Sequence, residues 1–368
     1  MGMATSIIQI GTIKIGGGLP VVLQSMTATK TTDVEKTAET CQRLADAGAG
    51  IVRVAVDTLH DAEALKEIRK RTTANLSVDL QENYRLAEIV APFVDKIRYN
   101  PGHLHHAEPE VSWRTKVERI VQIVRQHDCA LRIGVNCGSL DPALTTPTPP
   151  KEGNNIDVAV NSALQHAEFV DSLGFAQFCV SIKSSDPKAV LLANRQFAAV
   201  RPDIPIHLGL TEAGLPPMGI EKSRAALEPL LAEGIGDTLR VSLTVPNDRK
   251  AEEIEAGRLI LQNVAAGTIL TDWKPQGVNI ISCPSCARVE NERFVLLAEQ
   301  VREATQSLNV PLTIAVMGCR VNGPGETDHA DIGLWCGKNS VNLKSGSTLI
   351  GSFAYEEVIE KMLQLCEH

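Results

Sequence analysis

The chain has 368 residues, of which 43% are hydrophobic and 22% charged, and its formal net charge at pH 7 is -8. The length favours two domains over one. The negative charge argues against non-specific nucleic-acid binding, and no apolar run approaches the roughly 20 residues that a membrane span requires. The N-terminal segment lacks a basic region followed by an apolar one, so we expect a cytoplasmic protein without a secretion signal.

A short β-branched run, a polar loop and an amphipathic stretch recur in that order from about residue 20 to 245. The runs lie at 20–26, 50–56, 76–80, 96–100, 131–135, 178–183, 206–210 and 239–243. Eight such alternations predict an α/β fold, a (β/α)8 TIM barrel. A doubly wound open sheet is the alternative, but it usually has a glycine-rich loop after the first strand, where this chain has QSMTATKTTD.

Local signals mark the helices and loops between these runs. The stretch 33–48 fits a helix with Asp33 as its N-cap and Gly48 just past its end. Residues 145–155, TTPTPPKEGNN, read as a proline-rich loop after the fifth strand.

The alternation stops near 271–279, which predicts a barrel domain over 1–270 and a smaller α+β domain over 271–368. The expected elements of the second domain are a strand at VNIIS, a helix over 287–307, a strand at LTIAVM, short strands from DIGLWC to LIGSF, and a last helix at YEEVIEKMLQLC.

Polar side chains within the barrel strands are unusual, because parallel strands covered on both faces are normally apolar. The residues concerned are Arg53, Arg98, Asn100, Arg132, Asn136, Lys183, His207, Arg240 and Ser242. Polar groups near the C-terminal strand ends converge on the mouth of a barrel, where four arginines and a lysine would repel one another unless a polyanion lay among them. We infer a phosphorylated substrate, with a diphosphate favoured.

For any one of these arginines, extension to the barrel rim or pairing with a helix carboxylate is an equal alternative. Glu212, just beyond the seventh strand, is a candidate proton donor or acceptor, or a counter-ion.

The nine cysteines of a chain without a secretion signal do not indicate a disulfide framework. Cys283 and Cys286 form a CxxC pair, and Cys319 follows after a predicted helix and strand, so three thiolates are available where a four-iron cluster usually has four. Cys336, Glu326 or an exogenous ligand could supply the fourth position. Structural zinc bound by the four cysteines is the alternative metal centre, and a redox dithiol is the alternative for the CxxC pair.

The remaining cysteines and the histidine run point to no further site. Adjacent histidines in HLHH (103–106) cannot all face one ion, and no acidic partner is suitably spaced, so we interpret the run as a loop. The isolated cysteines are expected to be buried thiols, namely Cys41, Cys129, Cys137, Cys179 and Cys366.

Several stretches resemble one family over nearly the whole length: IGGGLPVVLQSMT, IVRVAV, VDKIRYNPG, LRIGVNCGSL, SIKSS, HLGLTEAG, LRVSLT, ISCPSCAR and MGCRVNGPGE. The chain is similar to the GcpE (IspG) family of 4-hydroxy-3-methylbut-2-enyl diphosphate synthases of the methylerythritol phosphate route to isoprenoids. The resemblance implies a TIM barrel followed by a [4Fe-4S] domain, and a head-to-tail homodimer. It also implies reductive ring opening of 2-C-methyl-D-erythritol 2,4-cyclodiphosphate with loss of water, using two electrons from flavodoxin or ferredoxin.

The resemblance further assigns roles to the matching residues. Cys283, Cys286, Cys319 and Glu326 would hold the cluster, Glu326 as a labile ligand, and Glu212 would be the proton donor. The diphosphate would be held by Arg53, Arg98, Arg132, Asn136, Lys183, Arg240 and Ser242. Gln81 and Asn83 depart from the family's histidine and aspartate, which puts proton delivery from that loop in doubt. A function of a different class, a metal-stabilised phospholigand-binding protein or electron carrier, is the alternative.

Overall fold

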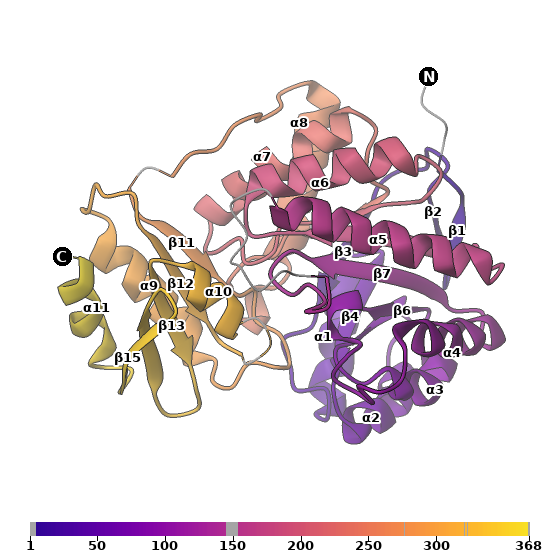
Figure 1. The fold of residues 1–368 in the computed structure, drawn as a ribbon, viewed down its shortest axis with the longest axis horizontal. Helices are drawn as coiled ribbons and strands as arrows, with labels where there is room; N and C mark the ends of the chain where they lie inside the picture. The colour runs from indigo at the N-terminus through magenta and orange to yellow at the C-terminus, as the bar shows by residue number, and fades with distance from the viewer. Residues whose placement is uncertain (1–4, 145–153, 276, 320, 322, 367–368) are drawn as a thin grey trace.

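The computed structural model describes residues 5–144, 154–275, 277–319, 321 and 323–366. Most of the predicted proline-rich loop, residues 145–153, lies outside these ranges. The chain forms a helix-covered barrel and a smaller C-terminal domain built on its own sheet, which lies beside the barrel (Figure 1).

The barrel is an eight-stranded parallel sheet in the order β8-β7-β6-β5-β4-β3-β10-β9. Its strands are β3 (Val22–Met26), β4 (Ile51–Val56), β5 (Leu76–Leu80), β6 (Lys96–Tyr99), β7 (Ala130–Asn136), β8 (Phe178–Lys183), β9 (His207–Leu208) and β10 (Thr238–Leu239). A parallel bridge between Val180 and Ile206 links the two edges and nearly closes the barrel. Each strand overlaps one of the predicted runs, so the predicted TIM barrel is confirmed.

Helices cover the outside of this barrel (Figure 1). They are α1 (Val34–Asp46), α2 (Leu59–Arg69), α3 (Ala87–Val90), α4 (Trp113–Gln126), α5 (Asn154–Ser172), α6 (Pro187–Val200), α7 (Met218–Ala232) and α8 (Glu252–Ala266). Short 3-10 turns are η1 (Tyr84–Leu86), η2 (Ala91–Phe93), η3 (Pro101–His103) and η4 (Asn247–Arg249). The prediction for α1 is confirmed, because the Asp33 side chain accepts a hydrogen bond from the Lys36 amide and the helix ends before Gly48.

An antiparallel hairpin closes the N-terminal end of the barrel. Its strands β1 (Ile8–Ile10) and β2 (Ile13–Ile15) bury Ile8, Ile10 and Ile15 against Ile51, Ala130 and Cys179. The last two of these residues lie at the beginnings of β7 and β8, so the hairpin fills the end opposite to the C-terminal strand ends.

The C-terminal domain is a five-stranded mixed sheet in the order β11-β12-β13-β14-β15. Its strands are β11 (Asn279–Ser282), β12 (Thr313–Met317), β13 (Ile332–Cys336), β14 (Val341–Ser345) and β15 (Thr348–Phe353). The first three strands are parallel and the last two pairs antiparallel. The helices α9 (Arg293–Thr305) and α11 (Val358–Cys366) contact each other and the sheet, and α10 (Gly323–His329) contacts β12 and β13.

The helix predicted over 287–307 begins only at Arg293. Residues before it follow another path, because the Glu290 amide donates to Gly318 and the Arg288 side chain is drawn to the barrel. The last barrel helix ends at Ala266 and β11 begins at Asn279, on either side of the predicted boundary at 270.

Candidate active site between the barrel and the C-terminal domain

One cavity lies at the C-terminal ends of the barrel strands, under the loops that carry the CxxC pair and Cys319. Most of the predicted site residues line it: Arg53, Arg98, Asn100, Arg132, Asn136, Lys183, Glu212, Arg240, Ser242, Cys283, Cys286 and Cys319. Barrel cations and cysteines that lie far apart in the sequence therefore share one enclosure within a single chain.

Glycines in two strand segments make room for the long cationic side chains. A Cβ atom on Gly134 of β7 would lie 2.1 Å from Nε of Arg98, and one on Gly209 would lie 2.5 Å from Nζ of Lys183. A side chain at either position would displace the cation from its present path, so these glycines let Arg98 and Lys183 cross the strands as they do.

The cations in the cavity are poorly supplied with acceptors. The Arg53 guanidinium donates to the thioether sulfur of Met26 at 3.1 and 2.9 Å, which is a weak acceptor. Nε and Nη1 of Arg132 and Nε of Arg98 are buried without a hydrogen-bond partner among the described residues. Buried donors without acceptors are costly, so the cavity is suited to a ligand with several anionic oxygens.

Repulsion between the cations lowers their pKa values further, in addition to the effect of burial. Burial and then the neighbouring Arg132 and Arg53 lower the pKa of Lys183 well below its ordinary value. Burial and then Arg98 lower the pKa of Arg132 to about 10. A bound polyanion would reverse both shifts, because it stabilises the charged forms.

Two carboxylates compensate part of this charge. Asp79 accepts from Nη1 of Arg98 at 2.7 Å, and Glu253 accepts from Nη2 of Arg240 at 3.1 Å and from Lys250 at 2.9 Å. Burial alone would raise the pKa of Asp79, but Arg98 and Arg53 hold it well below its usual range. The cavity therefore keeps more cations than carboxylates.

The loop with the CxxC pair is fastened to the barrel by several side chains. Lys30 donates to the carbonyl oxygens of Ala287 and Val289 at 2.8 and 2.7 Å. Thr244 donates to the carbonyl oxygens of Ser282 and Cys283 at 3.0 and 2.9 Å. These bonds hold the cysteine loop over the strand ends.

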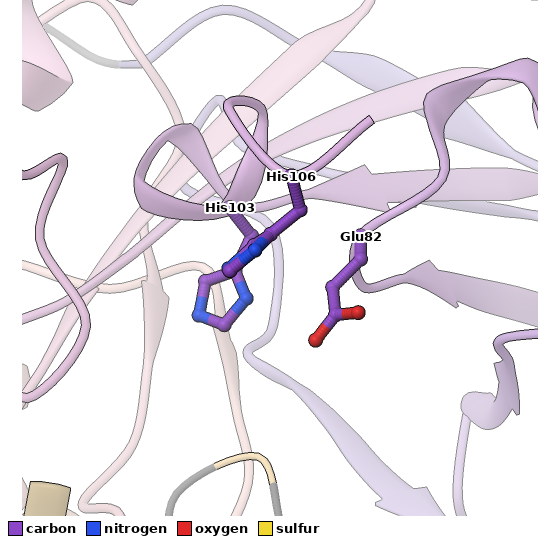
Figure 2. Close-up of side chains that lie close together, drawn as sticks. All are labelled: Glu82, His103 and His106. Carbon is purple, nitrogen blue, oxygen red and sulfur yellow. The ribbon is translucent and has the colours of Figure 1, made fainter. Parts of the chain in front are cut away.

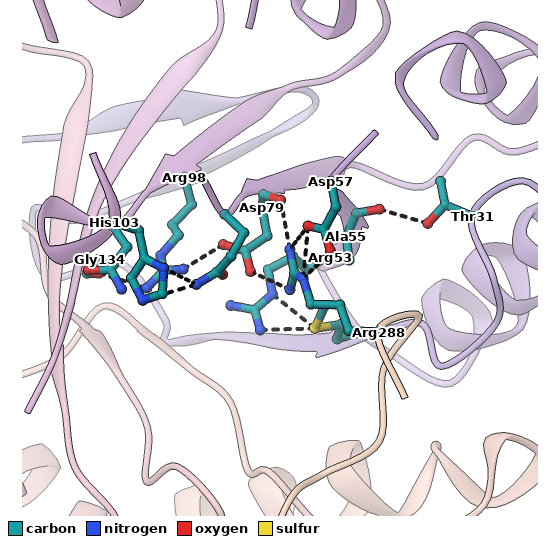
Figure 3. A network of polar contacts seen from close by, with 12 residues as sticks. Thr31, Arg53, Ala55, Asp57, Asp79, Arg98, His103, Gly134 and Arg288 are labelled. Carbon is teal, nitrogen blue, oxygen red and sulfur yellow. Dashed lines mark hydrogen bonds and ion pairs between the residues drawn. The ribbon is translucent and has the colours of Figure 1, made fainter. Parts of the chain in front are cut away.

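Arg288 and Asp79 belong to the site but were not predicted (Figure 3). Arg288 donates to both oxygens of Asp57 at 2.7 to 2.9 Å, and its Nη1 lies 3.1 Å from Asp79. Asp79 thus connects Arg98 of the barrel with Arg288 of the C-terminal domain. A charged residue within the strand run LSVDL was a signal for Asp79 that the sequence interpretation did not use.

Cys283 follows β11 and Cys319 follows the parallel neighbour β12, so both project from the same sheet edge. Sγ of Cys283 accepts from the Gly318 amide at 3.4 Å, and Ser285 adopts a left-handed φ of 57° between the CxxC cysteines. Burial, and then the nearby Cys319 and Cys286, raise the pKa of Cys283 well above its ordinary value. Three thiols that line one cavity fit a centre of several irons, in which each thiolate binds a different iron and the thiolates can lie farther apart than around a single ion. The positive charge of such a centre would stabilise the thiolates.

Cys336 lies apart from this group. It is fully buried on β13 in the apolar core of the C-terminal domain, and burial raises the pKa of its thiol to about 12. Tetrahedral zinc with bonds of about 2.3 Å would hold its ligand sulfurs roughly 3.8 Å apart. No three cysteines among the described residues lie within 4.8 Å of one another, which disfavours the four-cysteine zinc site.

Glu326 lies on α10, toward the barrel loops. Its Oε2 accepts from Oγ of Ser185 at 3.2 Å, and a Cβ on Gly138 would lie 2.9 Å from its Oε1. Burial, and then the carboxyl group of Glu212, raise the pKa of Glu326 above its ordinary value. Glu212 is itself 3% exposed and has a left-handed φ of 49°, a strained backbone of the kind found at functional sites.

His207 does not line the cavity in the described part of the chain. It is buried inside the barrel, where its Nδ1 lies 2.6 Å from Oγ1 of Thr238. Burial and then Lys183 lower its pKa well below the ordinary value, so the ring is neutral at neutral pH.

The expectation that the histidine run has no acidic partner is wrong. Potential ligand atoms of Glu82, His103 and His106 lie within 4.8 Å of one another. The carboxylate comes from the loop after β5, whereas the histidines follow β6. The nearby Gln81 lines the cavity, and Asn83 caps η1 by accepting from the Arg85 amide.

Within the described residues, no helix is both long and apolar enough to cross a membrane.

Comparison with known proteins places both parts of the chain in one family. The model of the GcpE TIM-barrel domain matches residues 5–258, and that of the GcpE protein C-terminal domain matches residues 279–368. A relative from Rhodopirellula baltica is 55% identical over 360 residues, which cover 97% of this chain and 94% of the relative. One from Nitratiruptor sp. is 39% identical over 98% of this chain and 96% of its own. Both are named 4-hydroxy-3-methylbut-2-en-1-yl diphosphate synthase (flavodoxin).

Among solved structures, dihydropteroate synthase from Yersinia pestis superposes with a TM-score of 0.49 at 12% identity, over 70% of this chain and 98% of that one. Likeness at this level says nothing about the reaction.

Proposed function

The chain belongs to the GcpE family, and we propose that it acts as its close relatives are named, as a 4-hydroxy-3-methylbut-2-en-1-yl diphosphate synthase that takes electrons from flavodoxin. The reaction is the two-electron reductive ring opening of 2-C-methyl-D-erythritol 2,4-cyclodiphosphate with loss of water, in the methylerythritol phosphate route to isoprenoids. The observation that carries this proposal is the cavity in which barrel cations face three cysteines.

The barrel cations are the proposed diphosphate site. Arg132 and Arg98 offer buried N–H groups that have no acceptor in the described part of the chain, and Lys183 adds a compact charge on the neighbouring strand β8. Guanidinium groups suit phosphate oxygens because they donate two parallel hydrogen bonds. Asn136 and Ser242 line the same wall and add neutral donors.

Cys283, Cys286 and Cys319 are the proposed protein thiolates for a [4Fe-4S] cluster, with Glu326 as a fourth, exchangeable ligand. When bound, such a cluster would supply electrons one at a time. The donor set fits, because three thiols line one cavity and a buried carboxyl group lies on the helix that follows Cys319. The reducing cytoplasm, which keeps thiols free, is the compartment we propose.

Glu212 is the proposed proton donor. Its carboxyl group lines the cavity and lies close to that of Glu326, and two such neighbouring groups cannot both ionise readily. Burial and the repulsion from Glu212 raise the pKa of Glu326 to about 8, which favours one shared proton on the pair. A carboxylic acid in this position could protonate a leaving oxygen of a substrate held by the barrel cations.

The test of the function is product analysis after anaerobic incubation with the cyclodiphosphate and reduced flavodoxin. Formation of 4-hydroxy-3-methylbut-2-enyl diphosphate with one turnover for every two electrons is expected. A protein that binds the cyclodiphosphate, or cycles electrons, but leaves the ring intact would instead be a binding protein or electron carrier.

Arg240→Ala is expected to raise KM for the cyclodiphosphate about 10- to 100-fold, with a smaller change in kcat, because one charged hydrogen-bonding group is lost from the diphosphate site. Steady-state kinetics with a chemical reductant measure this. Arg195→Ala is the matched control, since Arg195 lies half-exposed on α6 and pairs with Glu233. Unchanged affinity in Arg240→Ala would remove this residue from the diphosphate site.

We further propose the head-to-tail homodimer that the family resemblance implies. In this structure one chain completes the cavity by itself, and residues 267–275 after the last barrel helix are mostly exposed, so the same surfaces can meet between two copies. This is the geometry of a domain swap.

Mixing two inactive variants tests this arrangement. If one chain's cysteines serve the other's barrel, Glu212→Gln protein, which lacks the proposed proton donor, and Cys319→Ala protein refolded together should recover about a quarter of wild-type activity, because half the random dimers have one complete site of two. Size-exclusion chromatography with light scattering confirms the dimer in parallel. A mixture that stays inactive would mean that each site is built within one chain, as drawn here.

A further inference from the structure

A second group of potential metal ligands lies beside the cavity. Glu82 follows β5, His103 ends η3, and His106 lies in the loop beyond it. One ligand atom from each residue lies within 4.8 Å of the other two. Figure 2 shows the imidazoles on one loop and the Glu82 carboxylate across from them. Because β5 and β6 are parallel neighbours, their C-terminal ends meet at one barrel edge and bring the three side chains together.

The donor set has the chemistry of a transition-metal site. Two imidazole nitrogens with one carboxylate oxygen suit borderline ions such as Zn²⁺, whereas Mg²⁺ and Ca²⁺ prefer oxygen donors alone. Zinc bonds of about 2.0 to 2.1 Å in a tetrahedral site hold the ligand atoms roughly 3.4 Å apart. Side-chain rotations that move each ligand atom by about 1 Å would therefore close the group around one ion.

The three side chains differ in how far they are exposed to solvent. His103 is 7% exposed, Glu82 is partly buried, and His106 is exposed. The innermost ligand is thus fixed by packing, while the outer ligands face solvent and leave a path for an ion. Arg98, whose charge acts on His103, is compensated by Asp79 at 2.7 Å, which limits its repulsion of a cation.

Gln81 connects this group to the main cavity. Its side-chain amide lies 3.1 Å from Nδ1 and 3.4 Å from Nε2 of His103, and the same residue lines the cavity. Metal-bound histidines usually donate their second ring N–H to an acceptor that fixes the ring, and the Gln81 carbonyl can fill that role once the amide turns over.

We propose that Glu82, His103 and His106 bind one divalent transition-metal ion of the Zn²⁺ class at the barrel rim, separate from the cysteine centre. The ion would tie the loop after β6 to the end of β5. It would thereby fix Gln81 and, through η3, Asn100 in the wall of the cavity.

Equilibrium dialysis with Zn²⁺ against the anaerobically purified, cluster-loaded protein tests the site, with zinc and iron both counted. We expect one zinc per chain with no loss of iron. Glu82→Gln and His106→Ala should each weaken zinc affinity at least about tenfold. Both side chains are on the rim, so the variants should fold, which retention of the cluster's absorbance would establish.

His60→Ala is the matched control, because His60 is also exposed and lies 3.6 Å from a carboxylate, Glu63, on α2. Zinc affinity should be unchanged in this variant. The proposal is overturned if no zinc binds, if binding is the same in all three variants, or if each zinc displaces iron and therefore occupies the cysteine centre. These outcomes do not depend on catalytic activity, so failure here would leave the proposed function untouched.

Discussion

Cys319→Ala protein is expected to be purified without its cluster and with activity reduced at least about 1,000-fold, equivalent to roughly 4 kcal/mol in transition-state free energy. The reason is that Cys283 and Cys286 alone offer two thiolates, too few to retain a four-iron centre. Iron and sulfide analysis, visible absorbance and product formation measure the loss.

Cys336→Ala is the control that decides between the two candidate ligands in the C-terminal domain. Cys336 is buried like Cys319, at 0% against 7% exposed, but it lies in the apolar core and outside the cavity. This variant should keep its cluster and its activity, at a stability cost of about 1 kcal/mol for the missing sulfur. An intact cluster in Cys319→Ala, or its loss in Cys336→Ala, would refute the assignment of ligands.

Glu326→Gln protein is expected to keep its cluster but to lose at least about 100-fold in kcat, equivalent to roughly 2.7 kcal/mol. Three thiolates remain to hold the iron, whereas the exchangeable carboxylate and its interaction with Glu212 are gone. KM for the cyclodiphosphate should change little, because the barrel cations are untouched. Anaerobic kinetics, iron analysis and the Mössbauer spectrum of the cluster separate these effects.

Asp328→Asn makes the same chemical change two residues along α10, where the carboxylate pairs with Lys344 and not with the barrel residue Ser185. Its turnover and Mössbauer spectrum should match the wild type. If Glu326→Gln also turned over normally, Glu326 would have no part in the reaction. If it lost the cluster, the carboxylate would be a structural ligand and not an exchangeable one.

The parts of the site that could be predicted are those that depend on local pattern. Arginines in β-branched runs can be assigned to strands, and side-chain alternation then directs Arg98 or Arg132 to one face. The CxxC spacing likewise predicts that Cys283 and Cys286 can bind one metal centre. Cys319 could also be predicted, because a strand, a helix and a second strand bring the ends of two parallel neighbours, β11 and β12, to the same edge of the sheet.

The parts that could not be predicted depend on which loops meet. Arg288 was assigned to a helix, but it pairs with Asp57 and Asp79, more than 200 residues away in sequence. Glu82 is 103 - 82 = 21 residues from His103, a spacing that suggests no metal site until two parallel strands bring their ends together. His207 fitted the strand pattern, but its partner Thr238 on β10 holds it within the barrel wall.

The N-terminal hairpin closes one end of the barrel, so the barrel is open only at the C-terminal ends of its strands. Ile8, Ile10 and Ile15 fill its floor, so substrate and product must pass through the same opening. The cysteine loop covers that opening. It is held there by hydrogen bonds from Lys30 and Thr244 and by the ion pair of Arg288 with Asp57. Any movement that widens this opening must first break these contacts, so the cysteine loop and the barrel have to separate together at Lys30, Thr244 and Arg288.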